Sequence, residues 1–130
     1  MSPKIKIILI EDHALIMKFL KTFVERLDYD IVAEAKCGRE ALEVIKNIPA
    51  DLILLDLSLP HVTGLQILIE SKKIRATKVL IITMNMDSYI IQEALDAGAD
   101  GICLKDRCNE VLENAMLETL AGKHPVYLER

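Results

Sequence analysis

The sequence predicts one α/β domain in which a five-stranded parallel sheet carries helices on both faces. Short apolar runs alternate five times with segments whose apolar residues recur every three or four positions. One of these runs, residues 52–55, is apolar at every position, which is typical of a strand buried on both faces. The length of 130 residues suits a single domain with a sizeable core.

The strands are predicted from runs that are rich in β-branched and aliphatic residues. These runs cover residues 4–10, 30–35, 52–55, 78–82 and 101–104. The run at 30–35 is the least apolar of the longer ones, so we expect it near an edge of the sheet.

The helices are predicted from apolar residues spaced three or four positions apart, which form one apolar stripe on each helix. They cover residues 13–27, 40–48, 64–71, 87–97 and 109–120. Thr63 is the expected N-cap of the third helix, and Gly98 the expected C-terminal cap residue of the fourth. Pro49 ends the second helix, and Gly122 and Pro125 end the last.

Two parallel topologies suit five such units: a flavodoxin-like sheet of order 2-1-3-4-5, or a small Rossmann variant. The Rossmann variant needs a glycine-rich phosphate loop after the first strand, and here that loop reads Glu11-Asp12-His13. A dinucleotide phosphate would meet two carboxylates there. The sequence therefore predicts a flavodoxin-like (βα)5 domain over residues 1–122, with 123–130 as the start of a C-terminal linker or tail.

Composition narrows the class further. With 16 basic and 20 acidic residues the net charge is -4, and no basic stripe is present, which argues against nucleic-acid contact by this segment. The absence of a signal peptide and of an apolar run near ~18 residues predicts a cytoplasmic protein without membrane contact. The three cysteines lack metal-ligand spacing, which predicts free thiols in a reducing compartment.

Polar side chains end four of the five strands. They are Glu11, Asp12, Asp56, Thr83 and Lys105. Parallel strands end at one edge of the sheet, where open α/β proteins place their ligands, so we expect these side chains to converge. Taken singly, each has an ordinary explanation: an acid at a helix N-terminus, a threonine at a strand end, a solvated lysine.

Three converging carboxylates repel one another, by roughly 3–4 kcal/mol per pair at ~4–5 Å and an effective dielectric of 20. One lysine offsets only part of this repulsion. A hard divalent cation such as Mg²⁺ offsets it better. An aspartate beside such a cation can attack phosphorus and form an acyl phosphate, with Thr83 and Lys105 stabilising the phosphoryl oxygens.

These residues resemble a known family. The acidic pair, the D-x-x-x-P motif at 56–60 with Gly64 beyond it, Thr83, the G-A-D-G turn at 98–101 and Lys105 occur in order. Together they make residues 4 to about 120 similar to the receiver domain of bacterial two-component response regulators. Lys105 is followed by Asp106 rather than proline, which resembles the subfamily that carries a C-terminal LuxR/NarL-type helix-turn-helix.

The resemblance implies that Asp56 takes a phosphoryl group from the phosphohistidine of a sensor histidine kinase. It implies Mg²⁺ held by Asp12 and Asp56, by Glu11 through water, and by the backbone carbonyl of Ser58. Thr83 and Lys105 would contact the phosphoryl group and couple it to the surface of the fourth helix, fifth strand and fifth helix. The phosphotransfer and the autodephosphorylation would be self-catalysed, so the chain is not expected to be an enzyme acting on a metabolite.

The resemblance also bears on partners. Homodimerisation is expected, if it occurs, through the fourth-helix, fifth-strand and fifth-helix face, and DNA binding would belong to a C-terminal domain absent from this chain. Ser58 and Asn85 are expected to tune the phosphoryl lifetime.

Two residues depart from the family pattern. Ile102, three positions before Lys105, replaces a frequent aromatic, and Met84 is bulky where a small residue often follows Thr83. They keep open an alternative, a pseudo-receiver or stand-alone receiver acting as a protein-interaction module. An aspartyl-phosphate phosphatase or phosphotransferase is disfavoured, because it would carry a second aspartate where Ser58 stands.

Overall fold

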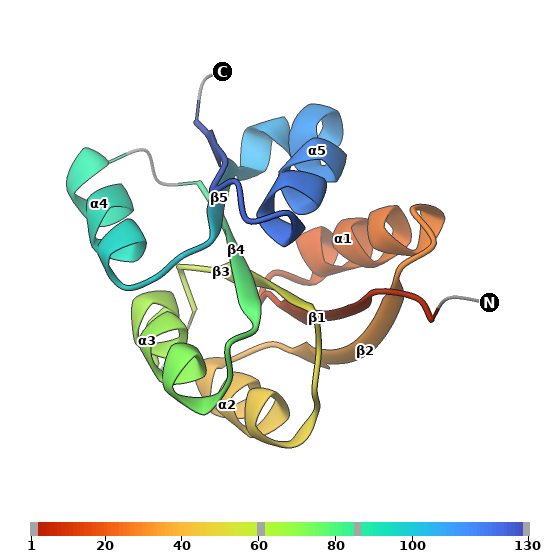
Figure 1. Cartoon of the computed structure of the whole chain (residues 1–130), viewed down its shortest axis with the longest axis horizontal. Coiled ribbons are helices and arrows are strands. Elements are labelled where there is room, and N and C mark those ends of the chain that lie inside the picture. Colours follow the sequence, from red (N-terminus) through yellow and green to blue (C-terminus); the bar gives the residue numbers. More distant parts are fainter. Residues whose placement is uncertain (1–2, 60–61, 85–86, 129–130) are drawn as a thin grey trace.

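A computed structural model describes residues 3–59, 62–84 and 87–128, and in it helices cover both faces of a parallel sheet (Figure 1). The strands are β1 (Lys6–Ile10), β2 (Asp30–Ala35), β3 (Leu52–Asp56), β4 (Lys78–Thr83), β5 (Gly101–Leu104) and β6 (Val126–Tyr127). The helices are α1 (Ala14–Arg26), α2 (Gly38–Asn47), α3 (Gly64–Ile74), α4 (Ser88–Asp96) and α5 (Cys108–Leu120), with a 3-10 turn, η1 (Lys105–Arg107), before α5. The strand order is β2-β1-β3-β4-β5-β6.

The sheet is built around β3, as its uniformly apolar run predicts. All five of its residues are buried, and it pairs in parallel with β1 on one side and β4 on the other. The less apolar β2 lies at the edge, which confirms its expected position. Asp56 is therefore a carboxylate at the end of the central, fully covered strand.

Two separate cores lie on the two faces of the sheet. Successive side chains of a strand point to opposite faces, so Ile7 and Leu9 join one core, while Ile8 and Ile10 join the other. The helices α1 and α5 cover the first core, and α2, α3 and α4 cover the second (Figure 1). None of the helices in the described part of the chain is long and apolar enough to cross a membrane.

The predicted caps Thr63 and Gly98 lie at helix ends, and Asp87, predicted as a helical residue, is the N-cap of α4. The Thr63 side chain accepts a hydrogen bond from the Gln66 amide, and the Asp87 side chain accepts one from the Tyr89 amide. Gly98 ends the turn after α4 with a φ of 105°, a left-handed conformation that favours glycine. These caps place α3 and α4 directly after the loops that leave β3 and β4.

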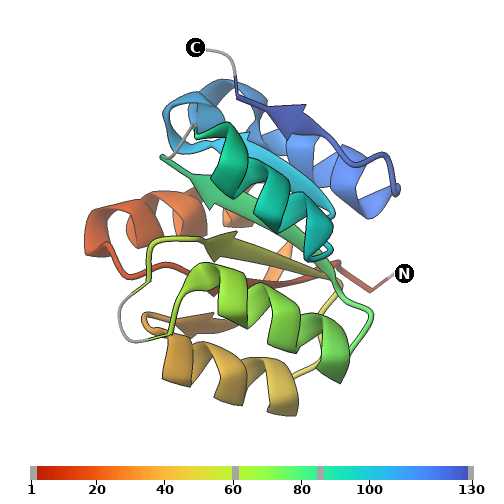
Figure 2. The same ribbon diagram turned by 90° about the vertical axis from the view of Figure 1, so that its left-hand side faces the viewer.

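The sixth strand corrects the five-strand prediction. Val126 and Tyr127 pair in parallel with Ile102 and Cys103 of β5, at the side of the sheet opposite β2 (Figure 2). The Ile102 amide donates a hydrogen bond of 2.9 Å to the Pro125 carbonyl. Two residues are too few to show strand periodicity, which explains why the sequence did not reveal this pairing. The division of the chain at residue 122 remains a prediction.

Candidate functional site

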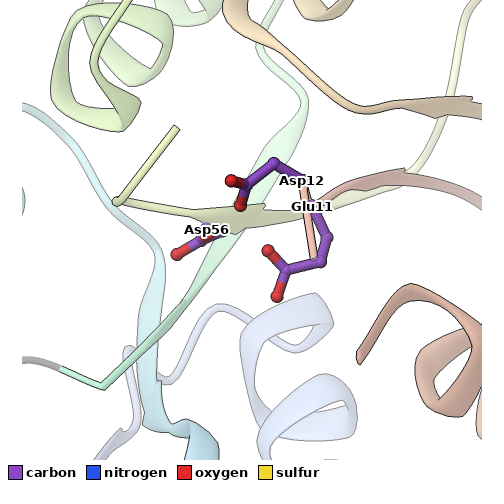
Figure 3. Close-up of side chains that lie close together, drawn as sticks. All are labelled: Glu11, Asp12 and Asp56. Atoms are coloured by element: carbon purple, nitrogen blue, oxygen red, sulfur yellow. The ribbon is translucent and has the colours of Figure 1, made fainter. Parts of the chain in front are cut away.

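Three carboxylates meet at the carboxyl edge of the sheet. Glu11 and Asp12 follow β1, Asp56 ends β3, and the two strands pair side by side with Ile10 opposite Leu55. One carboxylate oxygen from each acid lies within 4.8 Å of the others (Figure 3). The expected convergence of the strand ends thus brings the predicted acidic residues together.

The three acids differ in exposure. Glu11 is 1% exposed and Asp56 is 3% exposed, whereas Asp12 is exposed to solvent. A hollow of about 360 Å³ opens beside Glu11 and Asp12, between α1 and β2. A small ion or an anionic group can therefore approach from the Asp12 side, while the other two carboxylates sit in the protein interior.

Lys105 supplies the positive charge of the site. Its Nζ atom lies 2.6 Å from Glu11 Oε1 and 3.4 Å from Asp56 Oδ2, and its side chain is 11% exposed. Burial lowers the pKa of Lys105, but the close contact with the Glu11 carboxylate and the charge of Asp56 outweigh this, so the pKa is raised. The lysine is therefore an ammonium held between two carboxylates.

The crowding of carboxylates has its largest effect on the pKa of Glu11. Burial, together with the nearby Asp56 carboxylate, raises its pKa from 4.5 to about 7, although Lys105 opposes the shift. Within the described part of the chain, neither Glu11 side-chain oxygen has a hydrogen bond of normal geometry, despite the close ammonium. Buried carboxylate oxygens without a proper donor fit a hard divalent cation, either directly or through its water shell.

Thr83 and Ser58 complete the predicted set. Thr83 is fully buried at the end of β4, the strand between β3 and β5, so it lies between the acidic cluster and the strand that leads to Lys105. The Ser58 amide donates a 3.0 Å hydrogen bond to Asp56 Oδ1, which orients that carboxylate. Ser58 itself is exposed, and metal coordination by its carbonyl remains a prediction.

Gly64 has a positioning role that its place in a motif did not reveal. A Cβ atom there would lie 2.3 Å from the Leu57 Cα and 2.5 Å from the Asp56 carbonyl oxygen. The Gly64 amide also donates a 3.1 Å hydrogen bond to the Leu57 carbonyl. The start of α3 therefore packs directly on the backbone that carries Asp56, and only glycine leaves room for this.

The two departures from the family pattern have different surroundings. Ile102 is fully buried in the core that α2, α3 and α4 cover, whereas Met84 is 51% exposed. Pro60, His61, Asn85 and Met86 lie outside the described residues, so the expected role of Asn85 in the phosphoryl lifetime remains a prediction.

Fold and site together define a parallel α/β domain with an acidic cluster at the carboxyl edge of its sheet. The family model of the response regulator receiver domain matches residues 7–117, and the chain belongs to this family.

Similar proteins support this membership. The nitrate/nitrite response regulator protein homolog of Haemophilus influenzae is 37% identical over 82% of this chain and 52% of its own length. The nitrate/nitrite response regulator protein NarL of Escherichia coli is 32% identical over 90% of this chain and 55% of its own length. The crystal structure of a LuxR-family two-component response regulator from Aurantimonas sp. superposes with a TM-score of 0.89 and 29% identity, over 95% of this chain and 89% of that one.

The chain spans about half the length of the curated relatives it matches. Its similarity to NarL and to LuxR-family regulators confirms the predicted subfamily, and its receiver membership confirms the predicted class. Receiver domains are phosphoryl-accepting signalling modules rather than enzymes that convert metabolites, in line with the sequence prediction.

Proposed function

We propose that Asp56 is the phosphoryl acceptor of this receiver domain and that a sensor histidine kinase is the donor. The single observation that supports this most is the buried Asp56 carboxylate, flanked by Glu11 and Asp12 and contacted by Lys105. In the transfer, an Asp56 oxygen forms a bond to phosphorus while the bond from phosphorus to the donor histidine nitrogen breaks.

The chain's own residues prepare the acceptor. The Ser58 amide holds Asp56 Oδ1 in one orientation, and the Lys105 ammonium lies beside Oδ2. As negative charge gathers on the transferring group, Lys105 can move from Glu11 to a phosphoryl oxygen, because it already bridges both carboxylates. We assign the binding of a second phosphoryl oxygen to the Thr83 hydroxyl; the position of β4 between β3 and β5 supports this assignment.

Asp12, Asp56, Glu11 and the Ser58 carbonyl would hold Mg²⁺. When bound, Mg²⁺ would neutralise the excess negative charge of the cluster and of the phosphoryl group. Its fit rests on the three converging carboxylates and on the Glu11 oxygens that lack a normal donor.

We propose further that phosphorylation alters the face formed by α4, β5 and α5, and so controls a LuxR-type DNA-binding domain in the longer protein. Lys105 directly follows β5, so its movement acts on this face. Dimerisation through the same face and residence in the cytoplasm belong to the same proposal.

The proposal is tested by incubating the protein with acetyl phosphate and measuring its intact mass. We expect a mass increase of one phosphoryl group in the presence of Mg²⁺, and none after chelation or in Asp56→Asn. Asp12→Asn should lose the labelling at low Mg²⁺ concentrations that still label the wild type. Asp30→Asn, at an exposed aspartate at the start of β2, is the matched control and should label as the wild type does. If the protein binds partners but never gains the mass of a phosphoryl group, it acts as a protein-interaction module, which is the alternative that the sequence left open.

A further inference from the structure

Two cysteine thiols, one on each side of Lys105 in the sequence, meet in space. Cys103 lies in β5 and Cys108 is the first residue of α5, and their Sγ atoms are 3.9 Å apart. Cys103 is fully buried and Cys108 is 3% exposed. Both sulfur atoms also approach the Leu104 carbonyl oxygen, at 3.6 Å and 3.8 Å. The two thiols therefore share one small space.

The segment between these cysteines carries Lys105. Only residues 104–107 separate them, and η1 occupies most of that segment. The Lys105 ammonium contacts Glu11 and Asp56 from the first position of this turn. Any change in the separation of the two sulfur atoms must therefore be absorbed by the turn that positions the lysine.

A cavity reaches one member of this pair, Cys108. A cavity of about 140 Å³ reaches Cys108 and Lys105 from the α1 side. Its other lining residues are apolar: Leu15, Ile16, Phe19, Leu20 and Ile82. A small uncharged oxidant can enter such a cavity, whereas charged reductants and larger thiols are disfavoured there.

We propose that Cys103 and Cys108 form a reversible intramolecular disulfide that governs the position of Lys105. The oxidant is an organic hydroperoxide. The two S–H bonds and the O–O bond break, one S–S bond forms, and the hydroperoxide leaves as its alcohol and water. The two thiols are thereby oxidised by two electrons and the peroxide is reduced by two.

The disulfide has a mechanical consequence. The sulfur atoms must close from 3.9 Å to ~2.05 Å, which draws the start of α5 toward β5 and compresses η1. Lys105 is then displaced from the gap between Glu11 and Asp56. Small displacements of a positioned group have large effects on rate, so the oxidised protein should accept the phosphoryl group about tenfold more slowly. This effect on the rate rests on the proposed function.

The bond itself is tested first, in a Cys37→Ser background that retains the buried pair and removes the third thiol. After treatment with tert-butyl hydroperoxide we expect the intact mass to fall by two hydrogens. Digestion should yield a peptide joined through residues 103 and 108, and dithiothreitol should reverse both changes. Cys103→Ser and Cys108→Ser, each in the same background, should show neither change. Full alkylation of both thiols after treatment and denaturation would overturn the proposal.

The effect on Lys105 is tested next, by two independent readouts on reduced and oxidised Cys37→Ser protein. The first is the rate of labelling by acetyl phosphate with Mg²⁺, expected to fall about tenfold on oxidation. The second is the NMR amide signal of Lys105, expected to shift on oxidation even in an Asp56→Asn variant. If the reduced protein is not labelled by acetyl phosphate, the proposed function is rejected but the disulfide inference is not, because the NMR signal of Lys105 tests that inference independently. An unchanged Lys105 signal in oxidised protein would overturn it.

Discussion

At the scale of single residues, the site is defined by an imbalance of charge. Glu11, Asp12 and Asp56 bring three carboxyl groups together, and Lys105 supplies one ammonium within contact distance. Burial makes the imbalance costly, since Glu11 and Asp56 are almost fully removed from water. The pKa of Glu11 is raised because burial and the neighbouring Asp56 carboxylate disfavour its charged form.

The pKa of Glu11 predicts a pH dependence of stability in metal-free protein. Between about pH 4.5 and about 7 the folded protein keeps a proton that the unfolded chain has lost, so the free energy of unfolding should fall as pH rises through this window. The slope is at most about 1.4 kcal/mol per pH unit. Urea titrations with a chelator present should show this slope in wild type and a flatter one in Glu11→Gln. The exposed α1 residue Glu25 provides the control, Glu25→Gln, which should keep the wild-type slope. Equal slopes in Glu11→Gln and wild type would contradict the assignment.

The sequence predicted these site residues, because each one follows a recognisable strand and parallel strands end together. It could not predict that Lys105 contacts Glu11 more closely than Asp56, since side-chain distances depend on strand twist and helix packing. The contact of Cys103 with Cys108 was also missed, because their five-residue spacing matches no known ligand or redox motif.

At the scale of elements, the loop between β3 and α3 presents Asp56. Its Ser58 amide binds the carboxylate, and Gly64 lets α3 start against the loop backbone. The five sequence-predicted helices are all present, with ends that differ by a few residues. For example, α3 runs to Ile74 rather than residue 71, because Lys72 and Lys73 continue the helix although they add nothing to its apolar stripe.

Gly64→Ala is predicted to destabilise the protein by roughly 1–3 kcal/mol, because the added Cβ would overlap backbone atoms of Asp56 and Leu57. Gly64 does not adopt the positive φ of Gly98 and Gly122, so helix propensity alone would make alanine favourable at this position. The midpoint of urea unfolding and the rate of labelling by acetyl phosphate should therefore both fall. Gly122→Asn is a suitable control, since Gly122 has a φ of 79° with open space around it, and asparagine tolerates that conformation. Unchanged or increased stability in Gly64→Ala would show that the close approach is unimportant.

At the scale of the whole molecule, β6 ties the C-terminal segment to the sheet. It covers the edge of β5 that the five-strand prediction left open, and the Tyr127 hydroxyl donates a hydrogen bond to Glu118 of α5. Leu128 also packs against the core that contains Ile102. The α4, β5 and α5 face of this chain therefore includes a sixth strand, and any partner that pairs with β5 must first displace it.

Removal of residues 123–130 is predicted to lower the melting temperature by several degrees, because β5 loses its neighbouring strand and the core loses partly buried apolar surface. Differential scanning calorimetry of the truncated and full chains measures this. Tyr127→Phe, which removes only the hydroxyl contact with Glu118, should have a smaller effect. A truncated chain with the melting temperature of the full chain would show that β6 does not stabilise the domain.

The most direct test of the central claim locates the phosphoryl group on the chain. Protein treated with acetyl phosphate and Mg²⁺ is reduced with borohydride, which converts a phosphorylated aspartate to homoserine, and the peptides are sequenced by mass spectrometry. We predict homoserine at position 56, dependent on Mg²⁺, with Asp12 and every other aspartate unchanged. Homoserine at another position, or at none while the full wild-type chain stays folded, would contradict the account.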